Sequence, residues 1–442
     1  MSLVSLVSAG SNARGQLATG NSEDAHQFSA CQSAGFQPGT LPLGTHNIVQ
    51  IACGANHTLL LLDRLEDPSS SLVERELWGC GDGSKGQLGP SYTADISAAS
   101  GSTAVFRPLR LDLRRCGLQG YAIRTIAACW ETSYIALSCP GRSDVLLSMG
   151  ADDFGDLGVG GVKGKQSPSA VHIVDLQSVS CTRWDNSLTL RIISLTAGPH
   201  NMIVHLSLFQ KDQDSQEVIV GWGTSRHGQL GRHTDASSGR PVPFLCSPHL
   251  VCLPCTSPVV AAASGTHHAV FLHDSGLLSG LGSDRKSQLN GVDNIENVTA
   301  VDCTWNGTYA VVRNLAEWDI VSTGNHSKGQ LGRPLHTDNA ATHSHPPSAV
   351  HFPFSHMTHR LVKIACGSEH ILCLFSLAGK NNGDMYDTTE VWAWGWNEHG
   401  NLGIGNTQDQ DVPVRIWPTS SAEGKAVDVW AGCGTSWIVL GE

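Results

Sequence analysis

Seven copies of one short pattern are spread along the whole chain, and this repetition constrains the fold more than any other feature. In each copy an apolar run leads to a glycine and four variable residues, and the pattern ends on a leucine at a constant distance from that glycine. The last three residues read Gly-Gln-Leu in the clearest copies, and Ser287 replaces the second glycine in one copy. The copies lie at residues 10–17, 81–88, 150–157, 223–230, 282–289, 324–331 and 395–402.

A second pattern alternates strictly with the first, also seven times. It reads Ile-Ala-Cys-Gly-x-x-His-Thr and continues into an apolar run, most clearly at residues 51–62 and 364–375. The glycine between two apolar runs predicts a hairpin with a tight turn, because glycine adopts backbone angles that other residues resist. Degenerate copies complete the set, at residues 126–137, 195–206, 262–272, 301–312 and 429–440.

One hairpin and the strand that follows it predict a small sheet of three or four strands. Seven such sheets, arranged radially so that each protects the edges of the next, make an all-β, seven-bladed β-propeller. We expect this fold for residues 1–442 as a single domain. Because the chain opens with the first pattern and ends with the second, the last blade is predicted to be closed by both chain ends, residues 427–440 and residues 3–16.

The repeats are unevenly spaced, so the extra length is expected to leave the propeller as loops. These stretches are rich in Gly, Ser, Pro, Asp and His, which is typical of loops. The expected insertions are residues 90–105, 209–216, 234–258, 336–359 and 378–389.

Composition and charge exclude several classes of partner. Apolar residues make up 40% of the 442 residues, enough for a sizeable core, and the 48 glycines suit a turn-rich β protein. The net charge of −11 argues against direct binding to nucleic acid, which favours a basic surface. Neither a signal peptide nor a membrane-spanning run is present, so we expect a cytoplasmic protein, with the nucleus as an open alternative.

No set of catalytic or metal-binding residues stands out, so neither an enzyme activity, a cofactor nor a metal site is predicted. Residues 158–165 read GVGGVKGK, similar to a phosphate-binding loop, but Gln166 stands where a magnesium-binding Ser or Thr belongs. Cys252 and Cys255 have redox-pair spacing without a βαβ setting, so a turn is expected there. The histidines between residues 336 and 359 lack the fixed register of a structural zinc site.

The two patterns together resemble the regulator-of-chromosome-condensation repeat, and this resemblance covers essentially the whole chain. Within that superfamily, residues 391–402 (VWAWGWNEHGNL) and 429–440 (VWAGCGTSWIVL) are similar to the fungal alpha-tubulin suppressor branch, also known as killer-toxin-insensitivity proteins. The opening Gly-Ser-Asn at residues 10–12, the turn at residues 79–82 and the segment 302–305 point to the same branch.

This resemblance implies a function that the repeats alone do not. Members of the branch form a pair with a small CSL-type zinc-binding protein, which also serves diphthamide synthesis. The pair supports Elongator-dependent modification of wobble uridines in tRNA. The resemblance therefore implies a non-catalytic, protein-binding propeller, but it transfers no individual contact residue to this sequence.

The turns after the second-pattern glycines are the natural place for a binding surface. In a radial fold, equivalent turns lie on one face, and varied polar side chains on a rigid scaffold suit recognition. His57, His268 and His370 recur at these turns and are expected instead to hydrogen-bond neighbouring backbone within the repeat. The pattern assigns the turns to residues 56–57, 132–133, 200–201, 267–268, 307–308, 369–370 and 436–437.

Residues that depart from the repeat at these turns are candidates for contact with a partner. Trp392, Trp394 and Trp396 alternate along one strand, and two of them are expected in the blade core. Trp396 follows Gly395 in a loop and is a candidate for an exposed interface anchor. The candidate partner-binding residues are Trp130, Glu131, Trp305, Glu369, Trp396, Glu398, His399 and Trp437.

Two other functions remain open. Guanine-nucleotide exchange on a Ran-type small GTPase is known in the superfamily, but its founder uses a wedge at a blade edge and a basic tail, and the N-terminus here starts directly in a predicted strand. A light receptor built on tryptophans is conceivable, since there are 12 of them. However, the Gly-Trp-Arg-His-Thr motif of the plant ultraviolet receptor is absent from the sequence.

Overall fold

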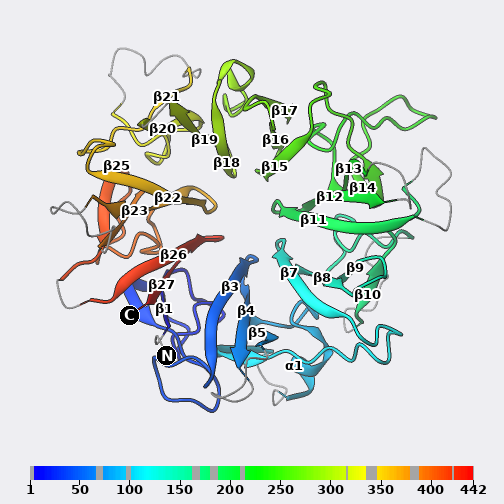
Figure 1. Cartoon of the computed structure of the whole chain (residues 1–442), viewed down its shortest axis with the longest axis horizontal. Coiled ribbons are helices and arrows are strands. Elements are labelled where there is room, and N and C mark those ends of the chain that lie inside the picture. The colour runs from blue at the N-terminus through cyan, green and yellow to red at the C-terminus, as the bar shows by residue number, and fades with distance from the viewer. Residues whose placement is uncertain are drawn as a thin grey trace. The chain divides into compact units, whose positions relative to one another are not determined.

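A computed structural model describes residues 4–65, 73–95, 101–161, 170–179, 188–209, 215–314, 317–334, 346–378, 388–420 and 423–441. These residues form seven antiparallel sheets (Figure 1). The chain divides into two compact units, each described here by itself. Unit 1 comprises Met1–Ala13, Thr19–Leu41 and Cys255–Glu442, and unit 2 comprises Arg14–Ala18 and Pro42–Pro254.

Unit 1 contains four of the sheets, and each has a largely apolar central strand that is buried along consecutive residues. Three have four strands and one has three. They are, in spatial order, β2 (Ala25–Ala30), β1 (Ser5–Gly10), β27 (Thr435–Gly441), β26 (Lys425–Ala431); β15 (Val259–Ser264), β16 (His268–His273), β17 (Leu278–Gly282); β18 (Val298–Thr304), β19 (Gly307–Asn314), β20 (Glu317–Gly324), β21 (Ser348–Ala349); and β22 (His359–Cys366), β23 (His370–Leu377), β24 (Thr389–Gly395), β25 (Gln410–Trp417).

Unit 2 contains the other three sheets, each with four strands. A short helix, α1 (Gly89–Asp95), comes between two strands of the first sheet along the chain. No helix in the described part of the chain is long and apolar enough to cross a membrane. The strands are β3 (Thr45–Cys53), β4 (His57–Leu65), β5 (Val73–Asp82), β6 (Ser102–Pro108); β10 (His172–Val174), β9 (Val145–Gly150), β8 (Thr132–Ser138), β7 (Ala122–Ala128); and β11 (Thr189–Ala197), β12 (Asn201–Phe209), β13 (Gln216–Thr224), β14 (Phe244–Leu250).

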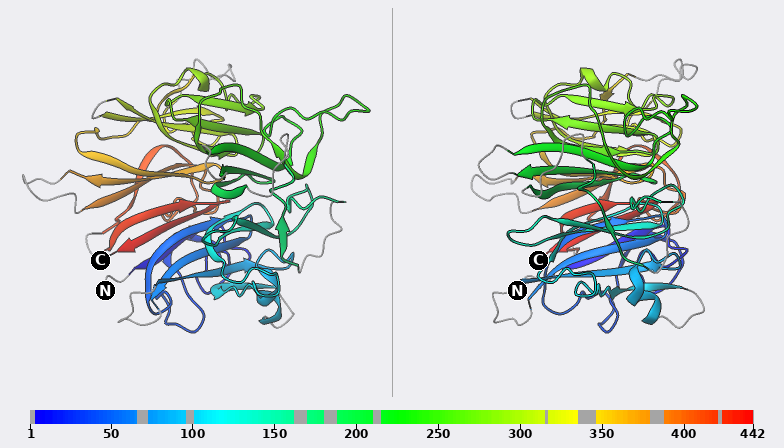
Figure 2. Two further views of the ribbon diagram at one scale, coloured as in Figure 1. Left: turned by 45° about the vertical axis from the view of Figure 1, so that its right-hand side comes forward. Right: turned by 90° about the vertical axis from the view of Figure 1, so that its right-hand side faces the viewer.

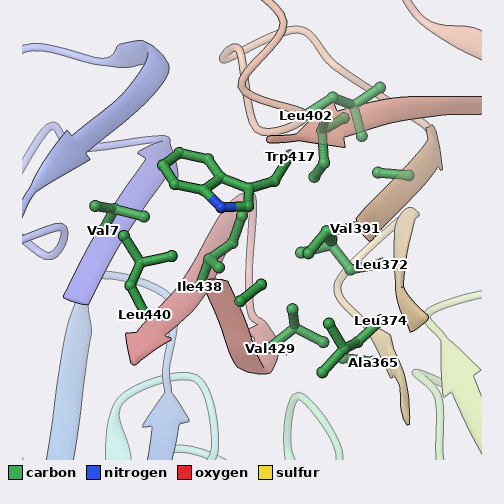
Figure 3. Packing of buried hydrophobic residues seen from close by; sticks show 13 residues of the cluster. Val7, Ala365, Leu372, Leu374, Val391, Leu402, Trp417, Val429, Ile438 and Leu440 are labelled. Carbon is green, nitrogen blue, oxygen red and sulfur yellow. The ribbon is translucent and has the colours of Figure 1, made fainter. Parts of the chain in front are cut away.

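The sheet made from both chain ends confirms the predicted closure. β1 and β27 lie side by side (Figures 1 and 2) and pair antiparallel from Ser5 opposite Leu440 to Gly10 opposite Thr435. Val7 of β1 reaches the same buried cluster as Ile438 and Leu440 of β27 (Figure 3). The N-terminal strand is therefore a central strand of this sheet, bonded to β2 on its other edge.

A one-residue bulge recurs in the first strand of every hairpin. At each site the pairing register shifts by one residue, so the bulged residue has no direct partner on the neighbouring strand. Because the bulge breaks the alternation of inward and outward side chains, it hides the period of two that sequence patterns reveal. The bulged residues are Val49, Arg124, Ile193, Val260, Thr299, Val362 and Val427.

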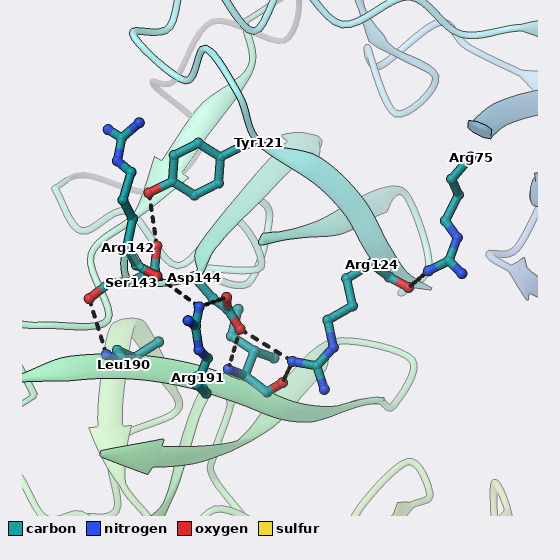
Figure 4. Close-up of polar contacts among 9 residues, drawn as sticks. Arg75, Tyr121, Arg124, Arg142, Ser143, Asp144, Leu190 and Arg191 are labelled. Carbon is teal, nitrogen blue, oxygen red and sulfur yellow. Dashed lines mark hydrogen bonds and ion pairs between the residues drawn. The ribbon is translucent and has the colours of Figure 1, made fainter. Parts of the chain in front are cut away.

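A buried carboxylate joins the sheets of unit 2 (Figure 4). Asp144 precedes β9, and its side chain is 1% exposed. Its two oxygens accept hydrogen bonds from Arg124 of β7 at 3.2 Å and from Arg191 of β11 at 2.8 Å. Arg124 also donates to the carbonyl of Ile192, and its own carbonyl accepts a 2.9 Å bond from Arg75 of β5. One polar cluster thus links three successive sheets.

Three of the expected loop insertions need correction, because they contain regular elements. Residues 90–105 include most of α1 and the start of β6, residues 234–258 contain β14, and residues 336–359 contain β21. β6, β14 and β21 are outermost strands that pair along one edge only, so their burial is partial and their apolar pattern weak. Residues 162–169 of the phosphate-loop-like segment lie outside the described residues, as do 210–214, 335–345 and 379–387 of the expected loops.

Candidate protein-binding surface

Backbone hydrogen bonds connect the hairpin turns from sheet to sheet. In unit 2, the N–H of Ala55 donates to the carbonyl of Trp130 at 2.9 Å, and the N–H of Trp130 donates to Pro199 at 2.8 Å. In unit 1, the N–H of Trp305 donates to the carbonyl of Ser368 at 2.8 Å. These bonds fix the turns relative to one another within each unit, so the side chains that they carry stand on a rigid base.

The three consensus histidines are internal parts of this base. A Cβ added to Gly54 would lie 2.1 Å from Cε1 of His57, so the glycine is needed to make room for the ring. His57 Nε2 lies 2.9 Å from the hydroxyl of Ser133 in the next sheet. His268 and His370 have equivalent contacts with hydroxyl groups, at 3.2 Å and 3.0 Å.

Burial lowers the pKa of each of these three histidines to about 4, so they are neutral at pH 7. Their structural role, as opposed to a role in binding a partner, is confirmed, but the expected hydrogen-bond partner is wrong. The partner is mainly a side-chain hydroxyl of the next sheet instead of backbone within the repeat. His370 also lies 3.2 Å from the backbone carbonyl of Thr435, and His268 has a backbone contact with Gly307, both in the next sheet.

Strand starts correct the register of the predicted turns. The second strand of each hairpin begins at the position of His57, which makes Thr132, Gly307 and Thr435 its counterparts. The sequence-based assignment placed these three turns one or two residues too late. The reason is that Cys129 and Thr304 replace the marker glycine, while two glycines surround Cys433.

Trp437 is the residue most affected by this correction. It lies in β27, is 0% exposed and is paired in register with Ser8 and Trp430. The expectation that Trp437 offers a surface to a partner is therefore wrong. Its indole is instead buried, and Nε1 donates to the hydroxyl of Thr435 at 3.3 Å.

Trp130 and Glu131 occupy one hairpin turn of unit 2 and are both partly exposed. The carbonyl of Glu131 accepts a 2.9 Å bond from the N–H of Ala151, which fixes the turn. Burial raises the pKa of the Glu131 carboxyl, and the nearby carboxylates of Asp153 and Asp82 raise it further, while Lys85 lowers it. This turn therefore lies in an acidic part of unit 2.

Trp305 and Glu369 come from neighbouring turns of unit 1. Trp305 is partly exposed, and its backbone is bonded to the residue before Glu369. The carboxylate of Glu369 accepts hydrogen bonds from Asn306 Nδ2 at 2.7 Å and from Gln330 Nε2 at 2.8 Å. Burial raises the pKa of Glu369. Both oxygens are thus engaged within unit 1, and Glu369 acts as a link between two sheets.

Trp396, Glu398 and His399 form a small surface cluster on the loop after β24. Trp396 Nε1 donates to Glu398 Oε2 at 3.2 Å, and the ring of His399 meets the indole edge-on with centroids 5.3 Å apart. His399 Nδ1 lies 2.7 Å from Asp24 Oδ2. Trp394 is fully buried and Trp392 partly so, as expected for the core, while Trp396 is partly exposed.

Backbone contacts bring this cluster next to Glu369, whose carbonyl accepts a 2.9 Å bond from the N–H of Trp396. The structure therefore brings together five of the predicted residues in unit 1, namely Trp305, Glu369, Trp396, Glu398 and His399. Trp130 and Glu131 belong to unit 2 and form a separate group.

Sequence reasoning missed three residues beside Trp130. The ring of His200 lies 5.5 Å from the Trp130 ring and 4.4 Å from the Phe154 ring, and its Nδ1 lies 3.8 Å from Oδ1 of Asp156. A usable signal was present, since Asp156 stands where other copies of the first pattern have an amide side chain.

Comparison with known proteins identifies the repeat. The profile described as the regulator of chromosome condensation (RCC1) repeat matches residues 6–61, 322–374 and 390–439. The RCC1 repeat-containing protein C10F6.04 of Schizosaccharomyces pombe is 25% identical, over 99% of both chains. The secretion-regulating guanine nucleotide exchange factor of Mus musculus is 26% identical, over 97% of this chain and 82% of that protein. The ultraviolet-B receptor UVR8 of Arabidopsis thaliana is 24% identical, over 90% of this chain and 77% of the receptor.

Solved structures share the fold. Human WBSCR16 matches with a TM-score of 0.67 and 19% identity, over 99% of both chains. Prp20p of Saccharomyces cerevisiae, whose binding to Gsp1p and histones has been studied, matches with a TM-score of 0.53 and 16% identity, over 99% of this chain and 91% of Prp20p. The chain is therefore an all-β, seven-bladed β-propeller that carries RCC1 repeats at residues 6–61, 322–374 and 390–439, with one blade made from both chain ends.

Proposed function

We propose that this propeller is a non-catalytic binding scaffold that holds a small CSL-type zinc protein as a heterodimer. Through that partner it supports Elongator-dependent modification of tRNA wobble uridines and diphthamide synthesis, without contacting nucleic acid or membranes itself. It acts in the cytoplasm, with the nucleus as a second compartment. The proposal rests on the resemblance of residues 391–402 and 429–440 to the tubulin-suppressor branch.

The cluster of Trp396, Glu398 and His399 is the observation that carries this proposal. A partly exposed tryptophan flanked by charged groups is the kind of residue that dominates binding energy at protein interfaces. The indole is held in place, because its edge lies against Gly434, where an added Cβ would be 3.4 Å from Trp396 Cζ3. A pre-positioned aromatic anchor loses little conformational entropy on binding.

Co-purification tests the proposal directly. Tagged protein from a fungal host is expected to recover the small zinc protein in equal amount. The double variant Trp396→Ala, Glu398→Ala should weaken this binding at least tenfold, as truncation of an interface anchor does. Met357→Ala serves as a control, because Met357 is 74% exposed in the same unit. No recovery by the unaltered protein, or equal recovery by the double variant, would contradict the proposal.

A second candidate is guanine-nucleotide exchange on a Ran-type small GTPase. Its support is the similarity, over 97% of this chain, to a protein named as a guanine nucleotide exchange factor. The measurement is release of a fluorescent guanine nucleotide from the GTPase with and without the propeller. Acceleration at catalytic amounts of propeller would favour exchange activity over the scaffold role.

A further inference from the structure

The same three positions of the repeat carry opposite chemistry in the two units. In unit 1, the carboxylate of Glu369 lies between two amides, those of Asn306 and Gln330, and accepts a hydrogen bond from each. The corresponding positions in unit 2 are Glu131, His200 and Asp156. There an imidazole takes the place of the carboxylate, and carboxylates take the places of the amides.

Asp156 makes only one of the two side-chain hydrogen bonds that Gln330 makes at the same position of the repeat. Gln330 Oε1 accepts the N–H of Lys328 at 2.8 Å, and Asp156 Oδ2 likewise accepts the N–H of Phe154 at 3.2 Å. The second oxygen, Oδ1, is buried and accepts no hydrogen bond from any described residue. Nδ1 of His200 lies 3.8 Å from this oxygen, beyond hydrogen-bond distance. The Asp156 side chain is 4% exposed, so this oxygen is an unpaired acceptor inside the protein.

Aromatic rings lie beside this acceptor. The His200 ring lies near both Trp130 and Phe154, with ring centroids 5.5 Å and 4.4 Å away. Phe154 is 37% exposed, and the His200 side chain is 26% exposed. The site is thus open to solvent at its aromatic rim and closed at Asp156.

The surroundings are negatively charged. Asp152 and Asp153 both act on Asp156, and Asp153 also acts on Glu131. Among the groups that act on Glu131, Lys85 is the basic one. An incoming cation would therefore meet a favourable field, and the rings would add cation–π attraction.

We propose that Trp130, Glu131, Phe154, Asp156 and His200 form a site for an arginine side chain of a protein partner. The guanidinium group is planar, so it stacks on aromatic rings while its N–H groups donate to carboxylates that lie in the guanidinium plane. It reaches Asp156 Oδ1 by displacing the imidazole of His200, and its positive charge favours the ionised carboxylate, so the proton that burial keeps on Asp156 at neutral pH is released to solvent on binding. A lysine ammonium group lacks this planarity. The inference rests on the proposed function as a protein-binding propeller and names the chemistry of one contact.

The test uses the full chain and a capped tripeptide, acetyl-Gly-Arg-Gly-amide. Binding is followed by NMR through the indole N–H signal of Trp130, assigned with Trp130→Phe. The arginine peptide is expected to shift this signal in a saturable way. The same peptide with citrulline, which has nearly the same shape without the charge, should bind at least tenfold more weakly. Equal shifts by the two peptides would overturn the proposal.

Two variants localise the effect. Asp156→Asn restores the amide found in other repeats, so it should fold, and it is expected to weaken arginine binding at least tenfold. Glu369→Gln alters the carboxylate of the equivalent group in unit 1, at the position that corresponds to His200, and should leave arginine binding unchanged. Unchanged binding by Asp156→Asn, or a site that responds to Zn²⁺ or Mg²⁺ but not to the arginine peptide, would refute the assignment. Recovery of the zinc protein in co-purification is scored separately, so failure of this site and failure of the proposed function are distinguishable.

Discussion

Asp156 is chemically unlike its six counterparts in the first pattern, which are all amides: Gln16, Gln87, Gln229, Gln288, Gln330 and Asn401. Its backbone role is ordinary, because its carbonyl accepts the indole N–H of Trp222 at 2.8 Å, as that of Gln330 accepts Trp394 at 2.9 Å. Its side chain is unusual because a buried carboxylate without a full set of partners is unfavourable when charged.

Replacing Asp156 by Asn is expected to stabilise the protein at neutral pH. Burial raises the pKa of Asp156 from 3.8 to about 8, with Asp152 and Asp153 adding to the rise against the bond from Phe154. The folded state therefore keeps a proton that the unfolded chain releases above pH 4, so this residue lowers the free energy of unfolding as pH rises from about 4 to about 8. Asp156→Asn removes this pH-dependent fall in the free energy of unfolding, which is on the order of a few kcal/mol at pH 8.

Urea unfolding at pH 5 and pH 8 measures the effect as the difference between variant and unaltered protein. The stabilisation by Asp156→Asn should be larger at pH 8. Asp319→Asn is the control, because Asp319 is exposed and is not among the groups that act on the pKa of Asp156, so its loss should change stability little at either pH. A stabilisation of equal size at both pH values would show that the carboxyl of Asp156 does not titrate in this way.

Single residues also show which side-chain environments the sequence pattern predicts and which it does not. The pattern revealed Trp396 beyond the end of its strand, and the structure places it partly exposed. It misplaced Trp437, because glycine spacing alone does not show whether Gly432 or Gly434 marks the turn. The substitution at Asp156 was visible in the repeat, but its meaning depends on burial and on the 3.8 Å distance to His200, which no sequence pattern provides.

At the scale of elements, Asp144 is expected to be one of the stronger ties between the sheets of unit 2. Asp144→Ala would leave the guanidinium groups of Arg124 and Arg191 without their shared acceptor, and we expect a loss of roughly 2–4 kcal/mol in the free energy of unfolding. Asp63→Ala is the matched control, because Asp63 pairs with Arg75 at 2.9 Å but is 19% exposed against 1% for Asp144.

Chemical unfolding followed by circular dichroism would compare the two variants. The control should lose about 1 kcal/mol or less, as exposed pairs do. Similar losses for both variants would mean that the buried carboxylate is no more important than a surface ion pair.

Inner and outer strands differ in how well the sequence predicts them. The second strand of each hairpin is central to its sheet and buried on both faces, so it appears as an apolar run such as residues 58–62. Outer strands such as β6 and β14 bury few side chains, so their sequences cannot be distinguished from those of loops. The seven bulges escaped notice because an extra residue has no signature in composition; only the pairing register reveals it.

For the whole molecule, the two-ended blade makes cooperative folding depend on β27. A chain ending at residue 432 would lose the partner of β1 along all six paired positions and the buried side chains of Trp437 and Ile438. We expect such a protein to lose its sharp thermal transition, measured by calorimetry. A synthetic peptide of residues 433–442 should partly restore the transition, whereas a truncated protein with an unchanged transition would contradict the idea.

The overall fold was predictable because each of the two sequence patterns occurs seven times. Fourteen half-units give the number of sheets, and their order gives the closing blade, which the pairing of β1 with β27 confirms. The binding partner, in contrast, is not predictable from the repeats. Recognition depends on the residues that depart from the repeated pattern.

The pairing of β1 with β27 also determines how the molecule would respond to pulling. In this antiparallel pair, Ser5 at the start of β1 lies opposite Leu440 near the end of β27. The hydrogen bonds run perpendicular to the strands, so tension applied to the two chain ends loads them one at a time, beginning at Ser5. The two strands would therefore separate by unzipping at low force. Pulling on both chain ends in an optical trap would detect this separation as the first extension step.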